Sequence, residues 1–147
     1  MRYEAPETID AAVALLAQGN GTAKVLAGGT DLLVQLRTGR IKPELVVDIK
    51  KIPELSKVAT DNGGFRVGAA VCGAELNERE DIKTAWPGVV EALDLIGSTQ
   101  IQGRASLGGN LCNASPAADS VPAMIAAGVV CSIAGPNGLR EAPVEDI

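Results

Sequence analysis

The spacing of apolar residues in the first third of the chain alternates between a helical and a strand pattern. Apolar residues recur at helical spacing from Ile9 to Leu16, behind Thr8 as a suitable N-cap, and Gly19 ends the run. In order, the pattern predicts a helix, a short buried strand, a second helix and a second strand, at residues 9–18, 24–27, 32–38 and 45–49. Such short connections are typical of βα packing, so the two strands should be parallel neighbours in one lobe over residues 1–52.

The pattern changes after residue 52. Two hairpins are expected, because pairs of strand-like segments flank the turn sequences Asp61-Asn62-Gly63-Gly64 and Gly135-Pro136-Asn137-Gly138. The strands of these hairpins are predicted at residues 56–60 and 65–69, and at 129–134 and 139–143. Helices are predicted at residues 74–79, 87–96 and 122–127, and a glycine-rich segment runs from Gly97 to Gly109. Residues 53–147 are therefore expected to form a second, mixed and largely antiparallel α+β lobe.

Composition limits the classes of function. Hydrophobic residues make up 46% of the 147, but only three residues are aromatic, so a stacking surface for single-stranded nucleic acid is not expected. The net charge of -5 and the absence of a basic cluster likewise argue against a nucleic-acid partner. The longest apolar stretch, Val121 to Gly135, is too short for a membrane span, which takes roughly 20 residues. The N-terminus lacks a signal-peptide pattern, and a cytoplasmic protein is the expectation.

Catalysis by side chains of this chain is not expected. The sequence has no histidine, which excludes histidine-dependent nucleophilic machinery within it. Its three cysteines form no CxxC pair, which argues against a disulfide framework, a zinc site or an iron-sulfur cluster held by this chain alone. No catalytic residue and no metal ligand is therefore predicted, and any chemistry would belong to a bound cofactor.

The first segment with a chemical signal runs from Lys24 to Asp31, as a strand, a Gly28-Gly29 turn and the start of a helix. Glycines let a backbone approach a ligand closely, and a helix N-terminus offers free N–H groups to a pyrophosphate. Thr30 adds a hydroxyl donor, whereas Asp31 is better suited to capping the helix. Alone the signal is weak, because a plain tight turn explains it equally well, and neither the Rossmann nor the P-loop pattern is present.

The second segment runs from Ala105 to Ser120 and gathers small polar side chains around the pair Gly108-Gly109. These polar residues are Ser106, Asn110, Asn113, Ser115, Asp119 and Ser120. Such a density beside glycines is expected where a chain wraps a polar ligand, although an Asn- and Ser-rich surface loop is the simpler alternative. Together the two segments could form a two-piece cradle for a dinucleotide diphosphate.

The motifs AGGTDLL (27–33) and SLGGNLCNASPAADS (106–120) closely resemble the two signature loops of a known family. This family is the FAD-binding (medium) subunits of xanthine dehydrogenases and of molybdenum-type carbon monoxide dehydrogenases. The resemblance implies a two-lobed α+β FAD-binding fold of the PCMH type, and the C-terminal domain of the family is absent from these 147 residues. By the same resemblance, the positions that bind FAD are Lys24, Val25, Leu26, Ala27, Gly28, Gly29, Thr30, Asp31, Ile96, Gly97, Ala105, Ser106, Gly109, Asn110, Asn113, Ser115 and Asp119.

The resemblance also implies a role in a complex. In the family, a large molybdenum-cofactor subunit oxidises substrate, and a small iron-sulfur subunit passes the electrons to FAD and then to NAD+ or another acceptor. Two alternatives are a stand-alone flavin oxidase domain and a truncated, non-catalytic assembly module.

Overall fold

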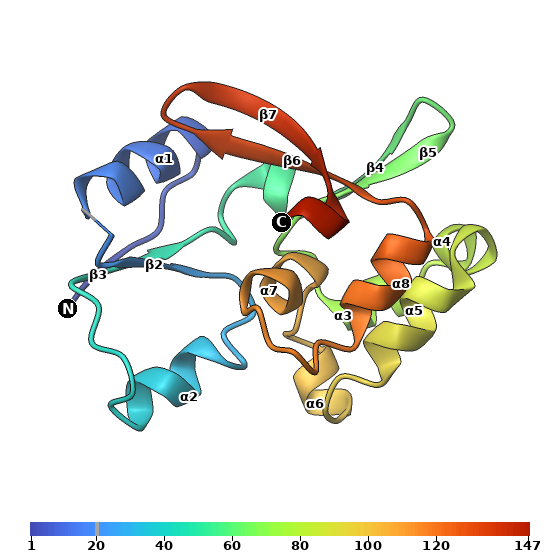
Figure 1. Cartoon of the computed structure of the whole chain (residues 1–147), viewed down its shortest axis with the longest axis horizontal. Coiled ribbons are helices and arrows are strands. Elements are labelled where there is room, and N and C mark those ends of the chain that lie inside the picture. The colour runs from blue at the N-terminus through green and yellow to red at the C-terminus, as the bar shows by residue number, and fades with distance from the viewer. Residues whose placement is uncertain (20) are drawn as a thin grey trace.

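The computed structural model describes residues 1–19 and 21–147. A parallel three-stranded sheet with two helices lies on one side of the molecule, and most of the helices gather on the other side (Figure 1). The first part contains, in chain order, β1 (Arg2–Glu4), α1 (Ile9–Gln18), β2 (Ala23–Leu26), α2 (Leu32–Arg37) and β3 (Leu45–Asp48).

The sheet has the order β1-β3-β2, and both neighbours of β3 run parallel to it, as predicted for β2 and β3. All four residues of β3 are buried because the strand is central, and Leu45 and Val47 join Ala12 of α1, Ile49 and Ile52 in the first core. Helix α1 begins as predicted, since the Thr8 side chain accepts a hydrogen bond from the Ala11 N–H at 3.2 Å.

One expectation for this sheet was wrong, and one of its strands was missed. Strand β2 is an edge strand rather than a buried one, so Lys24 and Val25 are exposed and only Leu26 is buried. Strand β1 was not predicted, because three residues are too few to show a strand pattern, and it is held by pairing with β3.

Among the described residues, the second part contains two hairpins, six α-helices and two short 3-10 helices, which are labelled η1 and η2. Its elements are η1 (Pro53–Leu55), β4 (Val58–Asp61), β5 (Gly64–Val67), α3 (Gly73–Asn77), α4 (Glu80–Ala85), α5 (Pro87–Asp94), α6 (Thr99–Gln102), α7 (Leu107–Cys112), α8 (Ser120–Ala126), β6 (Val130–Gly135), β7 (Gly138–Pro143) and η2 (Val144–Asp146). Both hairpins are antiparallel at the predicted turns. Asn62 and Gly63 have φ values of 48° and 81°, as the two-residue turn of the first hairpin requires.

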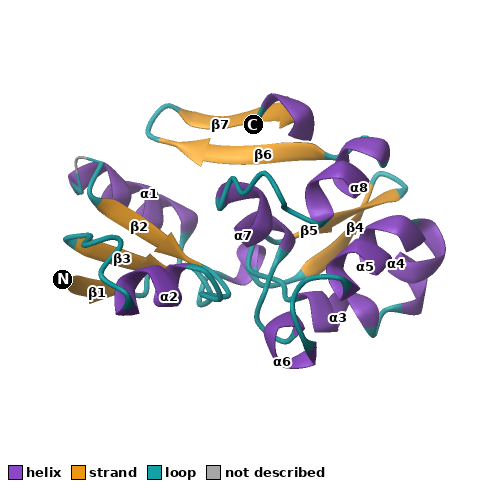
Figure 2. Ribbon diagram, turned by 60° about the horizontal axis from the view of Figure 1, so that its bottom comes forward, coloured by secondary structure: helices purple, strands orange, loops and turns teal. Residues whose placement is uncertain are grey.

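A second core lies under α3, α4 and α5 and consists of Val71, Leu76, Ile82, Val90 and Leu93. Helices α4, α6 and α7 were not predicted, since each has six residues or fewer and α7 contains two glycines, which disfavour a helix. The hairpin β6–β7 extends back from α8 to lie beside α1, so it bridges the two halves of the chain (Figure 2). No helix within the described ranges is long and apolar enough to cross a membrane.

Candidate functional site

The first glycine loop, residues 27–31, connects the end of β2 to α2 beside the sheet. Gly29 has a φ of 84°, a conformation that side chains rarely adopt, and its carbonyl accepts the Leu33 N–H at 3.0 Å. Asp31 occupies the N-cap position of α2, but its side chain makes no capping hydrogen bond, contrary to the expected capping role. Within residues 1–19 and 21–147, no protein atom accepts a hydrogen bond from the N–H groups of Gly28, Gly29 or Thr30. The loop therefore offers three consecutive donors.

The second glycine loop, residues 105–120, forms α7 and the connection to α8. Ser106 is 2% exposed, and its hydroxyl oxygen caps α7 by accepting the Gly109 N–H at 3.1 Å. The Ala105 carbonyl accepts the Gly73 N–H at 2.8 Å, which ties the start of this loop to α3. The N–H group of Gly108 in the first turn of α7 has no acceptor among the described residues.

Most of the polar side chains of the second loop make hydrogen bonds within the loop or to α2 and so stabilise its conformation. The Asn110 side-chain oxygen accepts from both the N–H and the hydroxyl of Ser120, at 3.2 and 2.6 Å. Asn113 accepts from Gln35 of α2 at 3.3 Å, and Ser115 accepts from the Ala117 N–H at 3.2 Å. These bonds fix α7 against α8 and α2.

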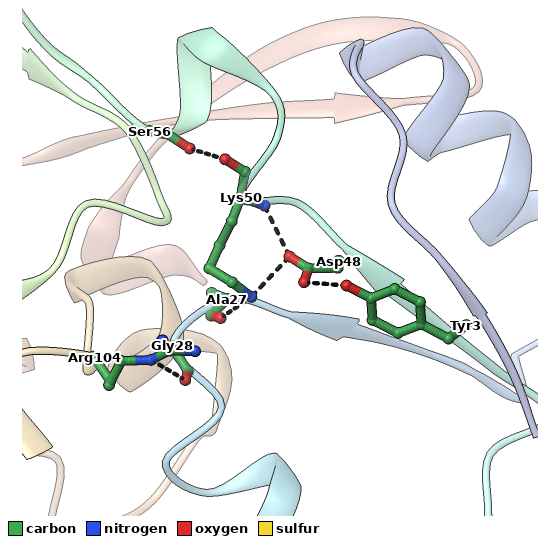
Figure 3. A network of polar contacts seen from close by, with 7 residues as sticks. All are labelled: Tyr3, Ala27, Gly28, Asp48, Lys50, Ser56 and Arg104. Atoms are coloured by element: carbon green, nitrogen blue, oxygen red, sulfur yellow. Dashed lines mark hydrogen bonds and ion pairs between the residues drawn. The ribbon is translucent and has the colours of Figure 1, made fainter.

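The two loops are in direct contact. A β-carbon built on Gly28 would lie 1.9 Å from the carbonyl oxygen of Arg104, so the backbones meet where no side chain fits. The Arg104 Nε donates to the Gly28 carbonyl at 3.5 Å (Figure 3). A β-carbon on Gly108 would similarly meet the β-carbon of Ala69 at 2.7 Å. The structure thus brings together two segments that are more than seventy residues apart in the chain.

A polar network behind the first loop was not found from the sequence. Tyr3 donates to Asp48 at 2.6 Å, and Asp48 also accepts from the Nζ and N–H of Lys50 at 2.8 and 3.0 Å. Lys50 Nζ also donates to the Ala27 carbonyl at 2.9 Å (Figure 3). The only sequence signal was a carboxylate and an ammonium two residues apart at the end of a buried strand, a spacing that places both on one face.

This network shifts two pKa values. Burial alone would raise the pKa of Asp48, but the hydrogen bonds from Lys50 and Tyr3 and the lysine charge outweigh burial and lower that pKa. The hydrogen bond to Asp48 raises the pKa of Tyr3, with further contributions from desolvation and from the carboxylate charge. Asp48 is therefore an ionised carboxylate, 6% exposed, with a phenol on one side and an ammonium on the other.

The remaining predicted positions take no part in the contact between Gly28 and Arg104 among the described residues. Ile96 packs against the second core, and Gly97, with a φ of 61°, lies in the connection from α5 to α6. Asp119 is exposed at the start of α8 and makes no capping bond. Two surface hollows of about 310 and 260 Å³ lie elsewhere, beside Gly19 and Leu45 and beside Trp86 and Ala123, and include no residue of either glycine loop. The loop contact, rather than a deep pocket, identifies the candidate site.

Comparison with known proteins gives one consistent result. Residues 1–147 match the model of a family described as the FAD binding domain in molybdopterin dehydrogenase. The chain is 33% identical over 143 residues to the carbon monoxide dehydrogenase medium chain of Hydrogenophaga pseudoflava, covering 97% of this chain and 50% of that one. It is 34% identical over 143 residues to the xanthine dehydrogenase FAD-binding subunit of Escherichia coli O157:H7, covering 97% and 49%.

A solved structure agrees with these sequence matches. Reconstituted carbon monoxide dehydrogenase from Oligotropha carboxidovorans superposes with a TM-score of 0.94 at 29% identity, covering 99% of this chain and 51% of that one. The chain thus spans about half the length of the relatives that it matches.

Proposed function

Because the chain belongs to the family of FAD-binding domains of molybdopterin dehydrogenases, we propose that its two glycine loops together hold the diphosphate of FAD. In this proposal the chain is the flavin-binding part of a molybdenum hydroxylase. A large molybdenum-cofactor subunit and a small iron-sulfur subunit are its partners, and NAD+ or another molecule is the final acceptor. FAD, when bound, supplies the electron-transfer chemistry.

The direct contact between Gly28 and Arg104 is the observation that supports this site. It brings the loop that carries the N–H groups of Gly28, Gly29 and Thr30 against Arg104 and Ala105, shortly before α7, where the Gly108 N–H also has no protein acceptor among the described residues. Consecutive backbone donors of this kind bind phosphate oxygens, and glycine allows the close approach. The site residues therefore fit a dinucleotide diphosphate without a histidine or a metal ligand set.

The chain's own residues have three tasks in this proposal. The glycine loops bind the diphosphate, the Asn110–Ser120 and Asn113–Gln35 hydrogen bonds keep α7 in place, and Arg104 adds a cation beside Gly28. Arg104 makes no ion pair with a carboxylate in the part of the chain that the structure describes. Its charge is thus available to an anion.

The test is a titration of the purified chain with FAD, followed by flavin fluorescence, with Gly109→Val as the blocking variant. A β-carbon at Gly109 meets only the Ser106 hydroxyl, at 3.0 Å, so valine changes the loop surface and crowds the hydroxyl that caps α7, but it meets no core side chain. Gly135→Val is the matched control, because nothing lies within 4 Å of a β-carbon there and the residue is in strand β6.

We expect the wild type and Gly135→Val to bind one equivalent of FAD and Gly109→Val to bind none, with all three still folded. Full occupancy in Gly109→Val would exclude the second loop as part of the site. A wild-type chain that binds no FAD would favour the assembly module. Anaerobic bleaching of the bound flavin by NADH would identify NAD+ as an acceptor, and its absence would point to another acceptor.

A further inference from the structure

Lys50 connects the interior of the sheet to the backbone of the first glycine loop. Its ammonium lies 2.9 Å from the Ala27 carbonyl and 2.8 Å from Asp48, and its side chain is 33% exposed. Tyr3 comes from β1, Asp48 from β3, and Ala27 directly follows β2, so the network spans all three strands at one end of the sheet. The Ser56 hydroxyl donates to the Lys50 carbonyl at 2.7 Å and holds the lysine backbone from the other side.

The hydrogen bond from Lys50 to the Ala27 carbonyl also fixes the direction of the neighbouring Gly28 N–H. A peptide group is planar and trans, so its C=O and N–H point in opposite directions. The peptide that carries the Ala27 carbonyl also carries the Gly28 N–H. When Lys50 holds that carbonyl toward the sheet, the Gly28 N–H must point away from the sheet, where it has no acceptor among the described residues.

Asp48 makes this arrangement rigid. One carboxylate oxygen accepts both the N–H and the Nζ of Lys50, and the other accepts the Tyr3 hydroxyl. The lysine side chain is therefore folded back over its own backbone toward β2. The charge of Lys50 is balanced by Asp48. Lys50 would therefore assist an anion site by orienting the Gly28 N–H rather than by attracting the anion with its charge.

We propose that Lys50 is a positioning residue for the flavin site, which aims the Gly28 N–H at the ligand by holding the Ala27 carbonyl. This rests on the proposed function, because it assumes that the first loop binds the diphosphate. Asp48 and Tyr3 act through Lys50 and do not touch the ligand.

The experiment measures the Kd for FAD of the 147-residue chain and three variants. Lys50→Met removes the ammonium at similar length, Lys50→Arg keeps a cationic donor, and Lys51→Met is the control, since Lys51 is the exposed neighbour. We expect Lys50→Met to raise the Kd at least tenfold, as for loss of a hydrogen bond to a charged group. Lys50→Arg should restore most of the affinity, and Lys51→Met should bind like the wild type.

A second readout separates positioning from stability. In ligand-free protein labelled with nitrogen-15, the Gly28 amide resonance should move in Lys50→Met and return toward its wild-type position in Lys50→Arg. If wild type binds FAD and Lys50→Met binds equally well while folded, the inference is wrong but the proposed site stands. If Lys50→Arg binds as weakly as Lys50→Met at equal thermal stability, the directional role is also wrong. A wild-type chain without FAD affinity overturns both proposals.

Discussion

The α-carbon of Gly28 faces the carbonyl oxygen of Arg104 so closely that an added β-carbon would lie 1.9 Å from that oxygen. The α2 side of the molecule and the segment leading into α7 therefore meet backbone to backbone. The neighbouring Arg104 side chain turns back to the Gly28 carbonyl, so each segment limits the position of the other. A ligand held by both loops would bind donors whose separation is set by this contact.

The first prediction concerns that contact. Gly28→Ala should lower the free energy of unfolding by about 2 kcal/mol or more, because the obstructing atoms are backbone atoms and a fixed backbone yields less than a flexible side chain. Gly88→Ala, where nothing lies within 4 Å of a β-carbon, should leave stability unchanged or slightly higher. Urea unfolding of both variants measures this. Equal midpoints for wild type and Gly28→Ala would mean that the loops separate easily.

The second prediction concerns the bond between α7 and α8. Ser120 is fully buried, and both its N–H and its hydroxyl donate to Asn110. Asn110→Ala should therefore cost about 1–3 kcal/mol of unfolding free energy, since two buried donors lose their acceptor. Asn113→Ala removes only an exposed 3.3 Å bond to Gln35 and should change stability by about 0.5 kcal/mol or less. If Asn113→Ala lowered the melting temperature more than Asn110→Ala did, this account of the second loop would be wrong.

How much of the molecule could be predicted follows from the range of the interactions. Helices α1 and α5 were predicted because a buried stripe and a start signal, Thr8 or Pro87, are local features. Both hairpins were predicted because turn residues such as Asn62 and Gly63 specify their own backbone conformation. Helix α7 was missed, because Gly108 and Gly109 oppose a helix locally and the tertiary contact with Ala69 requires a residue without a side chain.

The candidate site likewise has a part that could be predicted from the sequence and a part that could not. The two glycine loops are visible in the sequence because their residue types are unusual in a continuous stretch. The Lys50 network is not, because Tyr3, Asp48 and Ala27 come together only when β1 and β2 pair on either side of β3. Ser106 was predicted as a FAD-binding residue, and the structure adds that its buried hydroxyl caps α7.

The third prediction concerns backbone strain in the second loop. Ala114 follows α7 with a φ of 51°, in the left-handed region that costs an L-residue roughly 1–2 kcal/mol. Ala114→Gly should therefore raise the free energy of unfolding by about 0.5–1 kcal/mol, after the greater freedom of glycine in the unfolded chain is counted. Ala117→Gly, which has no positive φ to relieve, should lower stability slightly. A loss of stability in Ala114→Gly, measured by urea unfolding, would show that the alanine is not strained.

The fourth prediction concerns the titration of the Tyr3–Asp48 pair. The pKa of Tyr3 is raised by its hydrogen bond to Asp48, so the stability that this bond contributes is fully present below the ordinary tyrosine pKa of about 10. It is lost as the pH rises through the higher pKa of the folded state. The pKa of Asp48 is lowered, so its contribution is present above the ordinary value of about 3.9 and is lost as the pH falls through the lower folded value.

Tyr3 is the only tyrosine in the sequence, so the ultraviolet absorbance of the phenolate reports this one group. We expect the folded chain to ionise at a higher pH than the urea-unfolded chain, and Asp48→Asn to shift the folded titration back toward the unfolded one, because a neutral amide oxygen is a weaker acceptor for the phenol than a carboxylate and carries no charge. Tyr3→Phe is the control and should show no such absorbance change. At the acid end, the stability gap between wild type and Asp48→Asn should narrow below about pH 4, where Asp48 of the unfolded chain takes up a proton while the folded carboxylate is still ionised. Identical titrations of folded wild type and Asp48→Asn would show that the carboxylate does not hold the phenol, and the network behind the first loop would then consist of Asp48, Lys50 and Ala27 without Tyr3.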